Sequence, residues 1–516
     1  MAWGKNGTPD TLTTAGNNMN VSDLGGSKFN VVLSYTKRAT GTPYTTLYLN
    51  NDNSNNSYSR RQSENGGNDG TAIDQNFVIY DMGGDDADKF EITYIFGRSS
   101  SEKLAIGFGI NAGTSAGASG VPERGEFVWK WENTSDTIDR VDNQSGDGNY
   151  DTGSNLSVLG SDITPAPSTP AVPAIPALLP VVGGWKEVAR HTLGSNANPI
   201  LASSIPDKRY YMVLYHTKHS SGSWNQPRVR FGNGSTDAGS NYTQRYVFDY
   251  ASSDTTTAPN TYFLGWAGSG NNPNQPLFGM FHVANKSDKE KLVIHHATDN
   301  DATGNSDAPR SVEQVAKWTN ISNVIDRIEL NSASGSSNFT SGDEVVVLGW
   351  DPDDNHTDNF WEELANVNLA SAGDNISSGT FTAKKYLWVQ CFMEQTNNTI
   401  TGNITFNGDT GGNYCRRRSN NGGSQSVGLG ENSIDVRGGE SKNRFENMFI
   451  KNIAGDEKLV IGHHVVTTAG DDQTPDRTEY KAKWTNTSNQ ITSINFNNID
   501  SGDYGTKSFI RVWGHD

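Results

Sequence analysis

The sequence predicts an all-β protein made of three tandem antiparallel β-sandwich (jelly-roll-like) domains, and two observations lead to this prediction. Three segments of roughly 160 residues carry the same ordered landmarks, which indicates one folding unit present three times. Within each segment, short runs rich in aromatic and β-branched residues are separated by Gly, Asn, Ser, Asp and Thr, as is typical of strands joined by turns. Each copy is long enough to bury a core of its own.

The register of the three copies is fixed by short phrases. A Glu-Lys-Leu phrase at 102–106, 290–294 and 457–461 precedes a Lys-Trp pair at 130–131, 317–318 and 483–484. The glutamate and the tryptophan are 29, 28 and 27 residues apart, so the spacing is nearly constant. A closing phrase follows at 158–162, 347–351 and 512–516. We therefore predict repeat 1 over residues 1–162, repeat 2 over 184–351 and repeat 3 over 359–516.

Two strands of each copy can be predicted directly. The opening strands are expected at 28–35, 209–215 and 385–392, and the middle strands at 89–95, 277–283 and 444–450. Residues 89–95 alternate apolar and polar side chains, which predicts a strand with one buried face. Only residues 361–366 and 313–316 could form a turn or two of helix, and helices that short are marginal.

The two linkers differ in composition. Residues 163–183 are rich in proline, which predicts an extended, semi-rigid segment that holds repeat 1 away from repeat 2. Residues 352–358 form a short acidic linker, which predicts that repeats 2 and 3 form one compact body. On this basis we expect a protease to release repeat 1 by cutting near Ser168.

Charge and composition exclude some classes of function. The chain has 41 basic and 58 acidic residues and a formal net charge of −17, which argues against nucleic-acid binding and against adhesion to anionic lipid. The residues after Met1 lack a charged region followed by an apolar region, so we expect no secretory signal and synthesis in the host cytoplasm. The most apolar stretch, 171–182, is interrupted by prolines and too short to span a bilayer, so no membrane insertion is expected.

The sequence offers few candidates for metal binding. Cys391 and Cys415 both lie in repeat 3, so the fold does not depend on them, and free buried thiols are favoured over a disulfide. The His295-His296 and His463-His464 pairs follow the Glu-Lys-Leu strand, but repeat 1 has Phe108 where His296 and His463 stand, which favours packed strand positions over metal ligands. We therefore expect no cofactor and no metal.

Calcium is the alternative cofactor because acidic residues cluster in several loops. None of these clusters has the oxygen spacing of an EF-hand loop, so solvated loops are the default. The clusters lie at 85–88, 299–301, 351–358 and 471–476.

A basic and aromatic phrase supplies the candidate ligand-contacting residues, which are Tyr58, Arg60, Arg61, Tyr242, Arg245, Tyr414, Arg416 and Arg417. In strand geometry Arg61, Arg245 and Arg417 occupy one face in all three copies. These side chains could stack on a sugar or clamp an anion. The favoured interpretation is structural, with each arginine paired to a carboxylate or covering an aromatic ring. Trp131, Trp318 and Trp484 are expected in the core at equivalent positions.

Residues 406–423, the preceding strand at 386–392 and the Lys-Trp-Thr-Asn phrase at 483–486 resemble the β-sandwich repeats of virion structural proteins from tailed bacteriophages, particularly marine phages. Through the three copies the resemblance extends over nearly the whole chain. It implies a virion component displayed on the capsid or in the tail, and it implies no catalytic residues.

We accordingly predict a non-enzymatic structural protein of a phage particle, such as a capsid decoration, fibre or knob. Its expected partners are other virion proteins and further copies of itself. The alternative is a multivalent carbohydrate-binding protein that contacts host surface glycans, in which three weak sites would give avidity. A polysaccharide depolymerase is a weaker alternative, since no pattern in the sequence singles out a carboxylate pair.

Overall fold

A computed structural model describes residues 3–41, 44–80, 87–113, 115–162, 183–220, 226–251, 253–266, 275–333, 337–436, 440, 442–467 and 473–516. Over these residues all regular secondary structure is β, and every strand pairing is antiparallel. The sequence-based prediction of three antiparallel β-sandwiches is confirmed. Among the described residues no helix is long and apolar enough to cross a bilayer.

Repeat 1 pairs a nine-stranded sheet with a four-stranded sheet. The large sheet has the order β1-β15-β4-β10-β11-β12-β7-β8, with β2 paired to β15, and the small sheet has the order β3-β13-β6-β9. The strands of this domain are β1 (Gly4–Lys5), β2 (Asp10–Thr11), β3 (Asn18–Ser22), β4 (Phe29–Thr36), β5 (Arg38–Thr40), β6 (Thr45–Leu49), β7 (Tyr58–Glu64), β8 (Gly70–Gln75), β9 (Val78–Tyr80), β10 (Lys89–Phe96), β11 (Lys103–Asn111), β12 (Glu123–Trp131), β13 (Arg140–Ser145), β14 (Asn149–Tyr150) and β15 (Asn155–Gly160).

Repeat 2 has the same plan. Its large sheet has the order β16-β28-β18-β24-β25-β26-β21-β22, and its small sheet has the order β17-β27-β19-β20, with β23 paired to β19. The strands are β16 (Lys186–Thr192), β17 (Ile200–Ser203), β18 (Tyr210–Thr217), β19 (Pro227–Asn233), β20 (Ser235–Thr236), β21 (Tyr242–Phe248), β22 (Thr255–Asn260), β23 (Phe263–Leu264), β24 (Leu277–Ala284), β25 (Lys291–Asp299), β26 (Arg310–Trp318), β27 (Arg327–Ser332) and β28 (Glu344–Trp350).

Repeat 3 has a large sheet in the order β29-β41-β31-β36-β37-β38-β34-β35 and a small sheet in the order β30-β39-β33. The strands are β29 (Glu362–Asn368), β30 (Asn375–Ser377), β31 (Tyr386–Met393), β32 (Gln395–Thr396), β33 (Asn403–Phe406), β34 (Tyr414–Asn420), β35 (Ser426–Glu431), β36 (Asn443–Lys451), β37 (Lys458–Thr467), β38 (Asp476–Trp484), β39 (Ile494–Asn497), β40 (Asp503–Tyr504) and β41 (Phe509–His515). The two expected helical segments were wrong, because residues 361–366 run into β29 and residues 313–316 lie in β26.

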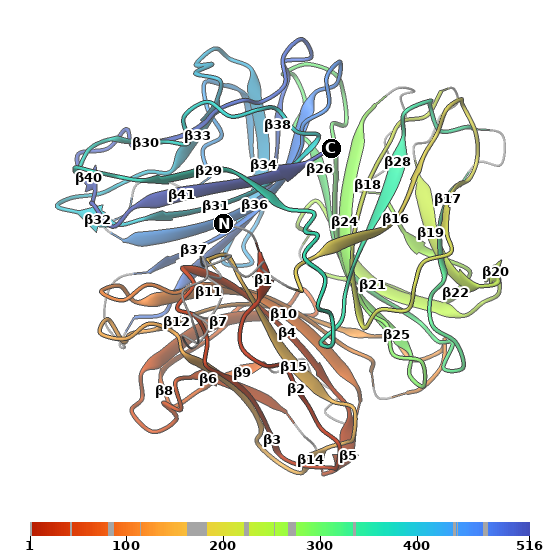
Figure 1. The fold of residues 1–516 in the computed structure, drawn as a ribbon. Coiled ribbons are helices and arrows are strands. Elements are labelled where there is room, and N and C mark those ends of the chain that lie inside the picture. The colour runs from red at the N-terminus through yellow and green to blue at the C-terminus, as the bar shows by residue number, and fades with distance from the viewer. Residues whose placement is uncertain are drawn as a thin grey trace, which may run out of the picture.

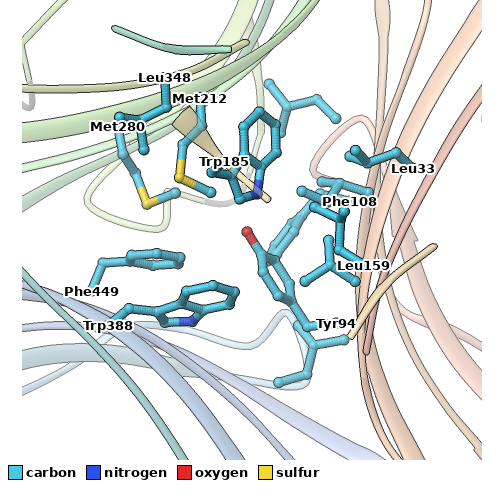
Figure 2. Packing of buried hydrophobic residues seen from close by; sticks show 14 of the residues in the cluster. Leu33, Tyr94, Phe108, Leu159, Trp185, Met212, Met280, Leu348, Trp388 and Phe449 are labelled. Carbon is cyan, nitrogen blue, oxygen red and sulfur yellow. The ribbon is translucent and has the colours of Figure 1, made fainter. Parts of the chain in front are cut away.

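Each sandwich encloses its own apolar core between its large and small sheets. A fourth core lies between the domains and takes residues from the large sheets of all three repeats. Figure 1 shows the three domains side by side around a common centre, and Figure 2 shows this shared core, with Leu33 and Tyr94 of repeat 1, Met212 and Met280 of repeat 2, and Trp388 and Phe449 of repeat 3. The central strands of the large sheets, such as β10, β24 and β37, are therefore buried on both faces.

Burial on both faces corrects the prediction for residues 89–95. Phe90, Ile92 and Tyr94 point into the shared core, so the apolar face of β10 packs against the neighbouring domains. The alternate residues include Glu91, which is also buried. Its burial raises the pKa of Glu91 to about 7. The alternation of apolar and polar residues in β10 distinguishes two buried environments rather than a buried face and a solvated face.

The shared core also corrects the predicted arrangement of the domains. Repeat 1 packs against both other repeats, so it is not held at a distance from them. The proline-rich linker lies outside the described residues apart from Gly183. Repeats 2 and 3 lie together, as expected, since both contribute to the shared core. The acidic linker between them also contacts repeat 1, because Lys5 donates through Nζ to the carbonyl oxygens of Pro352 and Asp354 at 2.9 and 3.0 Å.

Candidate functional site at the three-domain axis

Aromatic pairs close the three domains into a ring. Phe90 of repeat 1 packs on Tyr210 of repeat 2 with ring centroids 5.7 Å apart, and Phe278 of repeat 2 packs on Tyr386 of repeat 3 at 6.3 Å. Phe445 of repeat 3 returns to Phe29 of repeat 1 at 5.7 Å. The two members of each pair occupy equivalent positions on the middle and opening strands of their repeats. The same interface therefore occurs three times, as in a cyclic trimer.

The candidate arginines Arg61, Arg245 and Arg417 lie at these interfaces. Each donates through Nε to the backbone carbonyl of a proline in a neighbouring domain: Arg61 to Pro475, Arg245 to Pro122 and Arg417 to Pro309, at 2.8, 2.8 and 2.9 Å. The three prolines precede equivalent strands, β38, β12 and β26. Arg61 also forms an ion pair with Asp476 at 3.2 Å, and Arg245 with Glu123 at 3.3 Å. These contacts hold one domain to the next and leave the guanidinium groups without an open ligand surface.

The other candidate residues bond within their own domains. The hydroxyls of Tyr58, Tyr242 and Tyr414 accept the backbone N–H of Leu49, Phe231 and Phe406 at 2.8, 2.8 and 2.9 Å, and all three rings are buried. A buried ring has no free face for a sugar. Arg60 donates to the carbonyl oxygen of Ile79 at 3.1 Å, and Arg416 pairs with Glu431 and Asp435 at 3.1 Å each.

The repeated tryptophans are buried at equivalent positions. Trp131, Trp318 and Trp484 are at most 1% exposed, and each pairs in register with the first tyrosine of β7, β21 or β34. Each indole Nε1 donates at 2.7 Å to an aspartate of its own domain, namely Asp52, Asp237 and Asp409. Cys391 and Cys415 are free and buried.

The repeated Glu-Lys-Leu and Lys-Trp phrases bind a loop of the preceding domain. Lys317 donates to the carbonyl oxygen of Ala112 at 2.8 Å, and Glu290 accepts the backbone N–H of Gly117 at 2.7 Å. Lys483 and Glu457 hold the corresponding loop of repeat 2, since Lys483 donates to the carbonyl of Asn300 at 2.9 Å and Glu457 accepts from Gly304 at 2.6 Å. In repeats 2 and 3, landmark residues that reveal the repeat thus form contacts between domains.

The acidic clusters within the described residues face cations or hydrogen-bond donors of the protein. Asp301 pairs with Arg310 at 2.7 Å, Asp476 with Lys442 at 2.7 Å, and Asp88 accepts from the hydroxyl of Tyr35 at 3.1 Å. Asp85, Asp86, Asp471 and Asp472 lie outside the described residues. Because these carboxylates already have protein partners, their contacts do not support a calcium site among the described residues.

Three equivalent side chains meet where β11, β25 and β37 approach one another at the centre of the ring: Phe108, His296 and His463. The ring of Phe108 lies 4.6 Å from the rings of both histidines, and the two imidazoles are 5.0 Å apart, with interplanar angles of 64–66°. The three rings are therefore arranged around one pseudo-threefold axis, each tilted by a similar angle to the other two. Sequence reasoning found the equivalence of these positions but not their convergence.

A buried carboxylate lies beside the two histidines. Glu313 contacts Nδ1 of His296 and Nζ of Lys481, and its Oε1 lies 3.8 Å from Nε2 of His463. Burial favours a raised pKa for Glu313, but the imidazole of His296 and the ammonium of Lys481 outweigh it and hold the pKa well below its usual range. Burial lowers the pKa of His463 to about 4, so its imidazole is neutral at pH 7. The axis therefore contains a charged layer inside an apolar core.

A further histidine on this axis gives a pH prediction. His282 is buried, its Nε2 lies 3.4 Å from the hydroxyl of Tyr94, and burial lowers its pKa to about 3. Below pH about 6.5 the unfolded chain protonates this group and the folded protein does not, so stability falls by about 1.4 kcal/mol per pH unit. The substitution His282→Phe copies Phe449 of repeat 3 and removes this titrating group. When the pH falls from about 7.5 to about 5, we therefore expect the free energy of unfolding to fall by about 2 kcal/mol less in His282→Phe than in the native protein.

Urea unfolding at the two pH values measures this difference. Tyr94→Phe is the matched control, because it removes the same hydrogen bond and leaves His282 in place, so its pH dependence should equal that of the native protein. A His282→Phe variant that differs from the native protein by the same amount at both pH values would show that folding does not shift the protonation of His282.

Comparisons with known proteins supply no function. No family model matches the chain, and no curated protein matches its sequence. Among solved structures, the LG1-3 region of the laminin alpha2 chain is 10% identical over 98% of this chain and 96% of that chain, with a TM-score of 0.17. Domains LG4-5 of the mouse laminin alpha1 chain are 8% identical over 66% of this chain and 92% of that chain, with a TM-score of 0.15. Pseudomonas aeruginosa OccK7 is 10% identical over 94% of this chain and 98% of that chain, with a TM-score of 0.13. Overlaps this low carry no argument about fold or function.

Proposed function

We propose that the protein is a non-enzymatic structural component of a phage particle, in which one chain supplies a complete pseudo-trimeric block. The observation that carries the proposal is the cyclic set of equivalent contacts, from the Phe90–Tyr210 pair to the Arg61–Pro475 bond, which closes the three repeats on themselves. The resemblance of the repeat to virion β-sandwich proteins supports the same conclusion.

A closed pseudo-trimer is suited to a symmetric assembly. An open head-to-tail arrangement would leave a free interface at each end, whereas a three-membered ring uses all of its head-to-tail interfaces internally. What remains for partners is the outer surface, presented three times around one axis. Such a block fits a threefold or locally threefold position of a shell, where each domain can meet an equivalent neighbour.

The use of the repeated polar residues also supports a structural role. The repeated polar residues that contact other domains instead of lining an open cleft are Arg61, Arg245, Arg417, Glu290, Glu457, Lys317 and Lys483. An enzyme needs reactive groups within reach of a substrate. The groups that repeat in this chain hold the domains together.

Purified virus particles test the proposal. We expect mass spectrometry of gradient-purified particles to detect the chain in a fixed ratio to the major capsid protein, and a particle reconstruction to show three-lobed density on the capsid or tail. Host proteins carried through the same gradient serve as the control for contamination. Absence of the chain from infectious particles would contradict the proposal.

Carbohydrate binding is the second candidate, and an open depression in repeat 3 favours it. The depression has a volume of about 470 Å³ and is lined by Asn403, Glu431, Asp435 and Asp500 beside the side chain of Ile499, which is 73% exposed. Hydrogen-bonding groups next to an apolar surface suit the hydroxyl and C–H groups of a sugar. Binding on a glycan array that Asp500→Ala abolishes would support this candidate. Asp139→Ala, in a separate depression of repeat 1, is the control.

A further inference from the structure

Three buried side chains on the axis place metal-ligating atoms close together. His296 and Glu313 of repeat 2 and His463 of repeat 3 each offer one ligand atom, and these atoms all lie within 4.8 Å of one another. The three residues are 4%, 1% and 4% exposed. Side chains from two domains thus form one compact cluster of two imidazoles and a carboxylate.

Packing does not explain this cluster. Repeat 1 fills the equivalent position with Phe108, which shows that an apolar ring fits the axis. The histidines bring nitrogen atoms that need partners, yet Nε2 of His463 has no hydrogen-bond partner among the described residues. Leaving a buried polar atom without a partner is unfavourable, because the atom has lost its hydrogen bonds to water. A ligand that accepts this lone pair would remove that cost.

We propose that His296, Glu313 and His463 bind a divalent transition-metal ion of the zinc class on the pseudo-threefold axis. Two imidazole nitrogens and one carboxylate oxygen are a donor set that zinc accepts, whereas calcium and magnesium prefer oxygen atoms alone. Zinc takes these donors at about 2.0–2.2 Å in a tetrahedron. To meet that geometry, the 3.8 Å between Nε2 of His463 and Oε1 of Glu313 closes slightly, and the direct contact between Glu313 and Nδ1 of His296 opens.

The fourth position can be filled by water. Two cavities of about 10 Å³ flank Phe108, one lined by His463 and the other by His296 and Glu313. A space of this size holds about one water molecule. Because the protein ligands come from repeats 2 and 3, a bound ion would link these two domains at the centre of the ring.

Lys481 sets the strength of this site. Its ammonium group contacts Glu313, so it stays as an outer partner of the carboxylate while its charge opposes the ion. Repeats 1 and 2 have Val128 and Val315 at the equivalent strand position. Lys481→Val, which copies those repeats, is therefore expected to tighten metal binding by roughly tenfold or more.

Cobalt and zinc titration tests the proposal. The full-length protein is stripped with a chelator, partly unfolded and refolded with Co²⁺, since the ligands are buried. We expect one ion per chain, visible absorption bands of tetrahedral Co²⁺ with nitrogen and oxygen ligands, displacement of those bands by Zn²⁺, and a rise in Tm with added metal.

Matched variants identify the ligands. His463→Phe and His296→Phe copy Phe108 of repeat 1 and should abolish the Co²⁺ bands, whereas His282→Phe removes another buried histidine of the axis and should keep them. If the ligand variants fail to fold, the native protein and Lys481→Val still decide the matter. Native protein refolded in excess Co²⁺ that shows no tetrahedral bands and no bound ion would overturn the proposal, as would a Co²⁺ spectrum that persists in His463→Phe.

Discussion

Replacing Trp388 with alanine is expected to lower the free energy of unfolding by about 3–5 kcal/mol, because the indole lies where repeats 1 and 3 meet in the shared core. Its ring stacks on Trp3 of repeat 1 with centroids 4.4 Å apart and an interplanar angle of 11°. It also lies 6.0 Å from Tyr94 and 5.4 Å from Phe449 (Figure 2). Denaturant unfolding of the full chain measures the loss.

Trp266→Ala is the control for this experiment. Trp266 is half-buried at the margin of repeat 2 and packs on Phe248 at 4.9 Å, so its removal is expected to cost only about 1 kcal/mol. A second readout concerns the interface: after a cut near Ser168, the native fragments should stay together on a sizing column, and those of Trp388→Ala should separate more readily. Equal losses in the two variants would show that the shared core does not contribute more than the margin of one domain.

The secondary structure of each repeat could be predicted from the sequence because its causes are local. The expected opening strands match β4, β18 and β31 to within about two residues, as periodicity and β-propensity allow. The expected helix at 361–366 was wrong because Glu363 and Ala365 pair with β41, and tertiary pairing overrides a weak helical preference.

The arrangement of the domains could not be predicted because the linker composition does not encode it. Prolines in residues 163–183 favour an extended chain, but the position of repeat 1 is set by Phe29, Phe96 and Trp3, which pack on repeat 3. A face that packs on another domain has the same apolar pattern as one that packs on its own small sheet. One signal was available: β18 and β31 are mostly apolar on both faces, which is typical of strands covered on both sides.

For the candidate site, too, the equivalence of residues between repeats could be predicted from the sequence, whereas their contacts could not. The repeat showed that Phe108, His296 and His463 are equivalent, and it showed that Arg61, Arg245 and Arg417 share one face. Equivalent positions in a tandem repeat meet only if the copies surround a common axis, and nothing in the spacing of the copies specifies that axis. Glu313 was missed because sequence reasoning placed it in a helical turn, where its approach to His463 of another repeat has no local signal.

Replacing Arg477 with serine is expected to cost about 3–5 kcal/mol, because the change removes the cation that joins buried carboxylates of two repeats and leaves Glu126 only Arg124 and Asp69 only the more distant Arg61. Arg477 of repeat 3 donates to Asp69 and Glu126 of repeat 1 at 2.8 Å each, and it also contacts Glu479. The guanidinium is 4% exposed and Glu126 is 5% exposed. Serine is the residue that repeat 2 carries at the equivalent position, Ser311, so the substitution is compatible with the strand.

A double-mutant cycle separates the charge from the packing. Arg477→Ser combined with Asp69→Ser should be less destabilising than the sum of the two single changes, since the second change removes a carboxylate that the first leaves with only Arg61, at 3.8 Å. Arg327→Ser is the control, because Arg327 pairs with its neighbour Asp326 near the surface of repeat 2 and its loss should cost less than about 1 kcal/mol. Additive single changes, or an Arg477→Ser variant as stable as Arg327→Ser, would mean that solvent reaches these carboxylates. The junction of repeats 1 and 3 would then depend mainly on the aromatic core and on the contacts of Arg61 with Pro475 and Asp476.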